Sequence, residues 1–428
     1  EVVQVYYSAP DSEAAEKEYQ ELGAFAKTDL LQPGQSQEMT ITFNTKDMAY
    51  YNEAEAAYML DAGNYIIRVG NSSRNTHVAA VLALDETVKT EQLSNQLTVP
   101  EDQKFEELSK EGKTPYTYDT EADEIAAAQT IALTKESFGE PANHASAYDD
   151  ESVTTYTTDA SYEAKQDYEK VEVVEEKAGA KLLDVYNGDV SMEEFVAQMS
   201  VEELATLNCG SGWGVANEYS PIVGSNSDTI PGAAGETTVN YFDTYGIPSI
   251  VVADGPGGIR VKQEYVAKNV TTGEEATYYQ YCTAWPVSVL RGQTWNTELL
   301  EEVGEAFASE LEEMGITIVL GPSLNIHRDP LCGRNFEYYS EDPLISGTMS
   351  AAVTNGVQST EGVGACLKHY AGNNQETDRN TTNSVISERA LREIYLKGFE
   401  IAVKSSKPMS IMTSYNLING VPSADSYD

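Results

Sequence analysis

The chain has 428 residues, which is enough for two or three domains of about 150 residues each. Its 69 acidic and 27 basic residues give a net charge of −42, which argues against nucleic acid or anionic membrane surfaces as partners. The hydrophobic fraction of 41 % is enough for packed cores, and no run approaches the roughly 18 apolar residues of a membrane span. Cys209, Cys282, Cys332 and Cys366 are scattered and predict neither a zinc site nor a disulfide framework, so localisation stays open.

Residues 1–98 show the period-two alternation of antiparallel strands. The alternating runs surround Val5 and occupy 39–43, 65–69 and 78–84, with turn signals between them. Short strands separated by turns predict a β-sandwich, which needs about seven strands. Four or five are recognisable, so we expect the first strands to lie before Glu1.

Residues 99–185 change in composition and are rich in Glu, Asp, Thr, Tyr and Ser. So polar a segment cannot bury much apolar surface, and we expect an acidic linker that runs over the surface. Within it, residues 125–133 have the composition of a short helical piece.

From Ser191 onward, helix signals alternate with apolar strands. Ser191 and Glu194 form a capping box, Asn296 and Gly315 bracket a helix, and a further helix is expected at 343–358. A last helix is expected at 387–401, and the strands are expected at 249–253, 316–320, 363–367 and 409–413. This alternation predicts a parallel sheet, and its length favours an α/β fold of the (β/α) TIM-like barrel type. Fewer than eight strands are recognisable, so we expect the barrel to be incomplete at the C-terminus.

Polar clusters directly follow these strands. They are Asp254-Gly255-Pro256, Gly321-Pro322 leading to Gly333-Arg334-Asn335-Phe336-Glu337, Lys368-His369 with Arg379 shortly after, and Met412-Thr413-Ser414-Tyr415-Asn416. Because the carboxyl ends of barrel strands form one face, we expect these groups to converge there. Mixed polar groups with Tyr415, Trp285, Trp295 and Phe336 suit a neutral polyhydroxylated ligand. The sequence has no dinucleotide, P-loop or zinc-protease motif.

Each cluster also has a structural interpretation. Asp254 can cap its own loop, and Tyr415 can be ordinary barrel packing. For Glu337 we favour a structural ion pair with Arg334. Lys368 is harder to explain in this way, because a buried ammonium without a partner is costly.

The four motifs resemble those of the glycoside hydrolase family 3 β-glucosidases, in the same order and at similar spacing. The motifs are Asp254-Gly255-Pro256-Gly257-Gly258-Ile259-Arg260, Gly333-Arg334-Asn335-Phe336-Glu337 followed by Ser340-Glu341-Asp342-Pro343, Lys368-His369-Tyr370-Ala371-Gly372-Asn373, and Met412-Thr413-Ser414-Tyr415-Asn416. The resemblance identifies residues 186–428 as part of the family barrel and residues 1–98 as similar to its fibronectin type III-like domain, a multidomain arrangement in permuted order. It implies that an α/β sandwich domain and the rest of the barrel belong to the same enzyme, outside this chain.

The resemblance also implies a site and a reaction. The substrate-binding residues carried over are Asp254, Arg334, Lys368, His369, Arg379, Met412 and Tyr415. The implied reaction is retaining, exo-acting hydrolysis of terminal β-D-glucosyl residues from a β-glucoside or cello-oligosaccharide, without metal or organic cofactor. The family's nucleophilic Asp and acid/base Glu have no counterpart here, so we expect no catalytic residue in this chain and no activity from it alone.

Two alternatives stay open at this point. One is a β-xylosidase of the same family, and the other is a non-catalytic carbohydrate-binding or scaffold protein. The stretch Ala371-Gly372-Asn373-Asn374-Gln375-Glu376 lacks the histidine loop of the family's N-acetylglucosaminidases, which favours the glucosidase branch.

Overall fold

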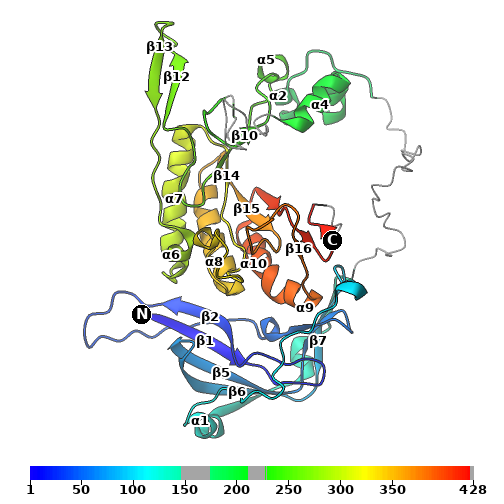
Figure 1. Ribbon diagram of the computed structural model, residues 1–428, viewed down its shortest axis with the longest axis vertical. Coiled ribbons are helices and arrows are strands. Elements are labelled where there is room, and N and C mark those ends of the chain that lie inside the picture. Colours follow the sequence, from blue (N-terminus) through cyan, green and yellow to red (C-terminus); the bar gives the residue numbers. More distant parts are fainter. Residues whose placement is uncertain (146–173, 211–226, 228, 425–428) are drawn as a thin grey trace.

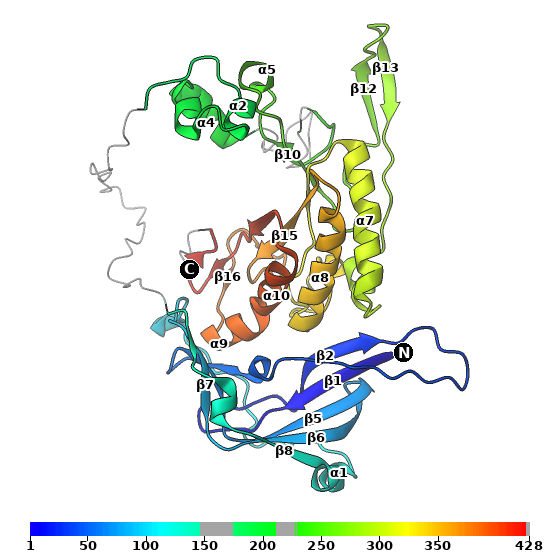
Figure 2. The ribbon, with the colours of Figure 1, turned by 180° about the vertical axis from the view of Figure 1, so that it is seen from behind.

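The structure, a computed structural model, describes residues 1–145, 174–210, 227 and 229–424. A β-sandwich built from the first 145 residues lies against the end of an α/β unit built from residues 229–424 (Figure 1). The view from behind shows the same arrangement, with the sandwich below α8, α9 and α10 (Figure 2). Within the described residues, no helix is long and apolar enough to cross a bilayer.

The sandwich has two sheets that enclose one core. The first sheet has the order β2-β1-β5-β6-β8, with strands at Glu21–Lys27, Val2–Ser8, Gly63–Ser72, Asn75–Leu84 and Gln129–Leu133. The second has the order β3-β4-β7-β9, with strands at Tyr50–Asn52, Ala57–Leu60, Val88–Gln92 and Ala142–Asn143. Tyr65 and Leu84 from the first sheet pack with Leu60 and Val88 from the second. Their burial explains the period-two pattern of the sequence.

Two expectations for this region are corrected. Residues 39–43 alternate between half-buried and exposed positions, but they form no strand, because no neighbouring strand pairs with them among the described residues. Part of the expected linker, residues 121–143, instead adds elements to the sandwich. Helix α1 (Glu121–Ala127) leads into β8, which pairs in parallel with β6, and the expected helix at 125–133 therefore ends after Ala127.

One ion pair and one hydrogen bond to the backbone, both between positions far apart in the sequence, explain why this acidic stretch folds onto the sandwich. Glu121 accepts a hydrogen bond of 2.7 Å from Arg68, which is 2 % exposed, and Glu124 accepts one of 3.0 Å from the backbone of Val78. A buried guanidinium needs an acidic partner, and α1 supplies it. Of the rest of the expected linker, residues 146–173 lie outside the described part of the chain.

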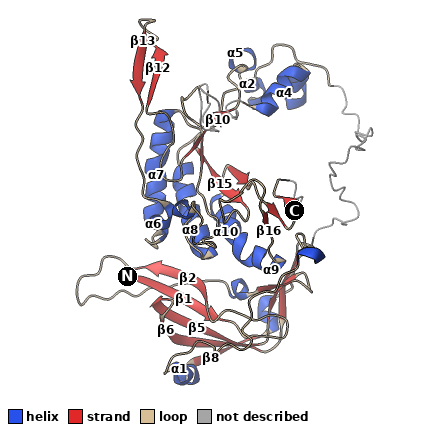
Figure 3. Ribbon diagram, viewed as in Figure 1, coloured by secondary structure: helices blue, strands red, loops and turns tan. Residues whose placement is uncertain are grey.

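The α/β unit contains a sheet of order β10-β11-β14-β15-β17, with strands at Gly235–Glu236, Val251–Asp254, Ile318–Leu320, Gly364–Tyr370 and Ser410–Thr413. The last four are parallel to one another, and β10 is antiparallel to β11. Helices α7 (Thr297–Met314), α8 (Pro343–Gln358) and α10 (Lys397–Ser406) pack side by side along it (Figure 3). A complete barrel has eight strands, so the described residues form about half of one.

Shorter elements surround the sheet. The helices are α2 (Leu182–Tyr186), α3 (Met192–Ala197), α4 (Val201–Cys209), α5 (Phe242–Tyr245), α6 (Ser288–Gly292) and α9 (Glu388–Ala390). The strands are β12 (Glu264–Lys268) and β13 (Glu275–Tyr279), which form a projecting hairpin, and β16 (Asn383–Ser384), β18 (Leu417–Ile418) and β19 (Val421–Pro422), which form a small sheet.

The expected helix signals are found at the ends of the helices. Asn296 accepts a hydrogen bond from the backbone of Leu299 at the start of α7, and Gly315 ends that helix with φ of 74°. The capping box of Ser191 and Glu194 is formed at α3. The helix expected at 387–401 is instead interrupted, because a π-helical turn, η5 (Leu391–Tyr395), separates α9 from α10.

Helix α7 packs so closely on α8 that we predict a steric effect of one added methyl group. A Cβ at Gly356 would lie 2.1 Å from the carbonyl oxygen of Glu301, so Gly356→Ala should lower the free energy of unfolding by about 1–3 kcal/mol. Urea denaturation measures this. Asn355→Ala, at the exposed neighbouring position of α8, is the matched control and should not destabilise the protein. Equal stability of Gly356→Ala and the parent would contradict the described packing.

Candidate functional site

Asp254 ends β11 and begins a loop that only glycine can form. Gly255 has φ of 146°, and a Cβ there would lie 1.8 Å from the carbonyl oxygen of Gly258. The loop therefore folds back tightly, and the backbone N–H of Arg260 donates to the carbonyl oxygen of Asp254 at 2.8 Å. The turn brings the Arg260 guanidinium to 2.7 Å from the Asp254 carboxylate.

Lys368 on β15, which β14 separates from β11 in the sheet, provides a second cation for Asp254. The ammonium lies 3.0 Å from the carboxylate, and the Lys368 side chain is only 3 % exposed. Burial acts to raise the pKa of Asp254, but the charge and hydrogen bond of Lys368, with Arg260, outweigh it, so the pKa is lower than usual. Asp254 is therefore an ionised acceptor held between two donors. The alternative in which it merely caps its loop does not account for these partners.

A second cluster of charges is centred on Arg334. Its guanidinium donates to the buried carboxylate of Glu337, which also accepts a hydrogen bond of 2.7 Å from Ser323. This is the ion pair that we expected for Glu337. Burial acts to lower the pKa of Arg334, but the hydrogen bond and charge of Glu337 outweigh it and raise the pKa. Glu376 lies 3.8 Å from Arg334 on the other side.

Glu376 connects this cluster to Arg379. Its carboxylate lies 2.7 Å from the Arg379 guanidinium, which in turn lies 5.5 Å from the ring centroid of Tyr415. One carboxylate oxygen of Glu376 is buried and makes no hydrogen bond in the structure. Sequence reasoning assigned no role to Glu376, although it follows the Asn-Asn-Gln stretch of a quoted motif.

His369 is a buried, neutral ring beside these cations. Burial, together with the positive charges of Arg334, Lys368 and Arg379, lowers the pKa of His369 to about 2. Its Nδ1 lies 3.4 Å from the side-chain oxygen of Asn325, which also accepts the His369 backbone N–H at 2.9 Å. Because a carbonyl oxygen only accepts, the ring proton belongs on Nδ1, and Nε2 is left as an acceptor.

The lowered pKa of His369 predicts a loss of stability in mild acid. The unfolded chain takes up a proton below a pKa of about 6.5, whereas folded His369 does not until about 2, so stability falls as the pH falls from 6.5. From this group alone, the loss between pH 7 and 5.5 should be about 1.2 kcal/mol.

Denaturation of a His369→Gln variant at both pH values tests this expectation. The difference in unfolding free energy between the two pH values should be smaller than in the parent by about that 1.2 kcal/mol. Asn355→Ala, at an exposed position without a titratable side chain, is the control and should keep the parent's pH dependence. An unchanged dependence in His369→Gln would contradict the buried neutral ring.

These side chains surround one cavity of about 360 Å³, within the size range of small-molecule sites. Its lining residues are Asp254, Arg260, Leu320, Arg334, Phe336, Glu337, Lys368, His369, Glu376, Arg379, Met412 and Tyr415. All seven residues expected at the site are among them. The cavity thus combines charged donors and acceptors with the aromatic faces of Phe336 and Tyr415, a combination that suits a hydroxyl-rich ring.

Two expected aromatic residues lie elsewhere. Trp285 packs at 6.1 Å from the ring of Phe307 in the core of the α/β unit, and Trp295 contacts Phe25 of the sandwich. They are therefore packing residues, and neither lines the cavity. No group of three or more His, Cys, Asp or Glu side chains in the described part of the chain is arranged to hold a metal ion.

Comparison with known proteins agrees with this geometry. Residues 232–427 match the glycosyl hydrolase family 3 N-terminal domain, and residues 1–73 match the fibronectin type III-like domain. Over its whole length the chain is 36 % identical to β-glucosidase A of Butyrivibrio fibrisolvens, covering 47 % of that protein. It is 34 % identical to a β-glucosidase of Ruminococcus albus, covering 39 % of it.

A solved structure extends the similarity to the fold. The β-glucosidase of Paenibacillus barengoltzii superposes with a TM-score of 0.70 at 36 % identity, over 99 % of this chain and 41 % of that one. The chain therefore spans less than half the length of these relatives. Residues 232–427 are therefore similar to the N-terminal domain of the family 3 glycosyl hydrolases, and residues 1–73, ahead of that segment, are similar to a fibronectin type III-like domain.

Proposed function

We propose that this chain is the sugar-binding part of a retaining exo-β-glucosidase that removes terminal β-D-glucosyl residues from a β-glucoside or cello-oligosaccharide. The observation that carries the proposal is the convergence of Asp254, Arg334 and Lys368 around one cavity, from three separate segments: the end of β11, the loop after β14, and β15. No single ion pair would require all three to meet there. A glucose ring offers several hydroxyls at different positions, and this arrangement provides a partner for each of them.

The proposed roles follow from the charges. Asp254, ionised between Lys368 and Arg260, accepts hydrogen bonds from two glycone hydroxyls, and Lys368 and Arg334 donate to their oxygens. Neutral His369 offers an acceptor without adding another positive charge to the cavity. Met412 and Tyr415 give the ring an apolar wall, and Arg379, which lines the same cavity, binds a hydroxyl of the glucosyl unit and lies over the Tyr415 ring.

The catalytic carboxylates are proposed to lie beyond these 428 residues. Retaining hydrolysis needs a nucleophile and an acid/base whose carboxyl groups are about 5 Å apart. The acidic side chains that line the cavity are Asp254, Glu337 and Glu376, and each is paired with a cation, so none is free to attack or to donate a proton. We propose that the rest of the barrel and an α/β sandwich domain provide these two groups, in a permuted order in which that domain comes first.

The proposed reaction has two steps, the formation and the hydrolysis of a covalent glycosyl-enzyme intermediate. The nucleophilic carboxylate forms a bond to the anomeric carbon while the glycosidic bond breaks, and the acid/base protonates the leaving oxygen. Water then breaks the glycosyl-enzyme bond, with the same group now removing a proton from the water. The residues of this chain hold the glucosyl unit through both steps, so their contribution is binding and orientation.

A covalent trap tests this function. The full-length protein, incubated with a 2-deoxy-2-fluoro-β-glucoside that has an activated leaving group, should gain the mass of one fluoroglucosyl unit on one Asp outside residues 1–428. A label within residues 1–428 would contradict the proposed location of the nucleophile. Absence of both label and turnover would favour a non-catalytic carbohydrate-binding protein, and faster turnover of the matching β-xyloside would favour a β-xylosidase.

A further inference from the structure

Behind the cavity lies a buried cation that the proposed function does not use. Arg291, near the end of α6, is 4 % exposed. Its guanidinium donates to the carbonyl oxygen of Pro256 and, at 3.2 Å, to the hydroxyl of Ser288. Among the described residues no carboxylate lies within ion-pair distance of it, and its Nε has no hydrogen-bond acceptor. An arginine buried without an acidic partner is costly for stability alone, so its position needs another explanation.

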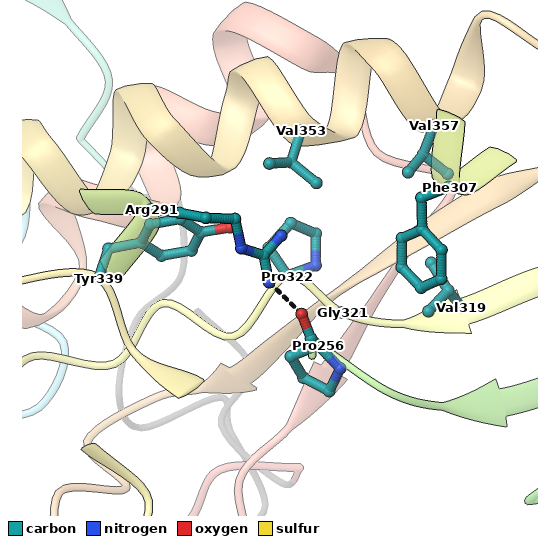
Figure 4. Close-up of a pocket in the computed structure, with 9 residues that line it drawn as sticks. All are labelled: Pro256, Arg291, Phe307, Val319, Gly321, Pro322, Tyr339, Val353 and Val357. Atoms are coloured by element: carbon teal, nitrogen blue, oxygen red, sulfur yellow. Dashed lines mark hydrogen bonds between the residues drawn. The ribbon is translucent and has the colours of Figure 1, made fainter. Parts of the chain in front are cut away.

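Arg291 contacts two of the segments that carry charged residues of the cavity. Pro256 stands two residues after Asp254, and the ring of Tyr339, whose centroid lies 5.9 Å from the guanidinium carbon, stands two residues after Glu337. Figure 4 shows the guanidinium between the Tyr339 ring and the Pro256 carbonyl, with Pro322 beside it. The Asp254 loop and the segment that contains Arg334 therefore share one side chain as their support.

The packing around this contact leaves almost no free space. The cavity beside Arg291 measures about 10 Å³, which is room for one water at most. Gly292, the residue after Arg291, lies directly against the segment that contains Arg334. A Cβ at Gly292 would lie 2.6 Å from the carbonyl oxygen of Tyr339. In so tight a site, a displacement of α6 must displace the loops that it contacts.

The turn that follows α6, just after Arg291, is held by the fibronectin type III-like domain. Lys27 on β2 donates a hydrogen bond of 2.7 Å to the carbonyl oxygen of Thr294, and Phe25 on the same strand lies edge-on to Trp295 with ring centroids 5.2 Å apart. Thr294 in turn donates its hydroxyl to the carbonyl oxygen of Arg291 at 2.7 Å. A continuous series of contacts thus runs from β2 through the turn after α6 to the two segments of the cavity.

We propose that Arg291 is a positioning residue, through which the fibronectin type III-like domain holds the Asp254 loop and the Arg334 segment at the spacing that a ligand needs. The kinetic part of this proposal rests on the proposed function, whereas its structural part does not. A residue that served stability alone would not have to reach both segments, and methionine fills a similar volume without burying a charge.

Hydrogen exchange of the full-length protein tests the structural part. In Arg291→Met, the backbone amides of residues 254–260 and 334–339 should exchange about tenfold faster, while the melting temperature changes by only a few degrees. Arg291→Lys, which keeps the charge and one donor, should give an intermediate rate. Lys27→Met, at the surface of the sandwich, should speed exchange of the same segments to a smaller extent.

Kinetics test the consequence for function. Misplacing the two segments should lower kcat/KM for an aryl β-glucoside on the order of 100-fold in Arg291→Met, with partial recovery in Arg291→Lys. The matched control is Arg74→Met, which removes another arginine that lies over a tyrosine ring, at 4.4 Å from Tyr116, far from the cavity. It should leave both exchange and kcat/KM unchanged.

Two results would overturn the proposal. One is unchanged exchange of both segments in Arg291→Met, which counts against it even if the protein hydrolyses no glucoside. The other is a large loss of melting temperature with normal kcat/KM in the folded enzyme, which would make Arg291 structural only. If the parent protein is inactive, the proposed function fails, and the exchange experiment still decides the role of Arg291.

Discussion

Replacing Asp254 by alanine should lower kcat/KM of the full-length protein for an aryl β-glucoside on the order of 10³-fold. The carboxylate is the only acidic group within 4 Å of Lys368 in the described part of the chain, and that ammonium is almost completely buried. Its loss removes the acceptor proposed for two glycone hydroxyls and leaves the lysine charge unbalanced. Steady-state kinetics with a chromogenic glucoside give the ratio directly.

Asp254→Asn is the informative companion variant. It keeps the size of the side chain and one acceptor oxygen but loses the charge, so its activity should lie between those of the parent and Asp254→Ala. Folding must be checked by thermal unfolding, because the ion pair also contributes to stability. The pKa of Asp254 is lower than that of a free carboxyl group. The stability that the ion pair contributes is therefore fully present above the usual carboxyl pKa, and it is lost as the pH falls through the lowered pKa of Asp254. Turnover within about twofold of the parent in Asp254→Ala would contradict the proposed role.

Replacing Arg334 by methionine should have the largest effect on stability, a loss of about 3–5 kcal/mol in the free energy of unfolding. Glu337 has a side-chain exposure of 7 %, and without Arg334 its carboxylate keeps only the Ser323 hydroxyl as a partner. Turnover should fall with it, because the cavity loses a donor. Urea denaturation and glucoside kinetics on the same preparation separate the two effects.

A double variant distinguishes the ion pair from the sugar contact. Arg334→Met with Glu337→Gln no longer buries an unpaired charge, so most of the lost stability should return while turnover stays low. Arg379→Met serves as a stability control, because that arginine is 40 % exposed and its pair with Glu376 should be worth less than about 1 kcal/mol. Recovery of activity in the double variant would mean that Arg334 acts only as the partner of Glu337.

Features that depend on local sequence could be predicted. The start and end of α7 follow from Asn296 and Gly315, and α8 follows from the cap at Asp342 with Pro343 in its first turn. The site also followed from a general rule, since the carboxyl ends of neighbouring parallel strands meet at one edge of a sheet. That rule brings Asp254 and Lys368 together although 114 positions separate them.

Features that depend on distant partners could not be predicted. Residues 121–133 appeared to be linker, because the burial of Arg68 against Glu121 is not visible in either segment alone. Glu376 was missed for the same reason, since its importance depends on Arg334 and Arg379 reaching it from two places. The prediction that Trp285 and Trp295 belong to the aromatic part of the site was wrong, because composition does not tell which face of a loop carries a ring.

The most direct measurement is a crystal structure of the full-length protein after reaction with the fluoroglucoside. Our account predicts a pyranose in the 360 Å³ cavity, with hydroxyl oxygens within about 3.2 Å of Asp254, Lys368 and Arg334. A sugar bound away from these three side chains would contradict it.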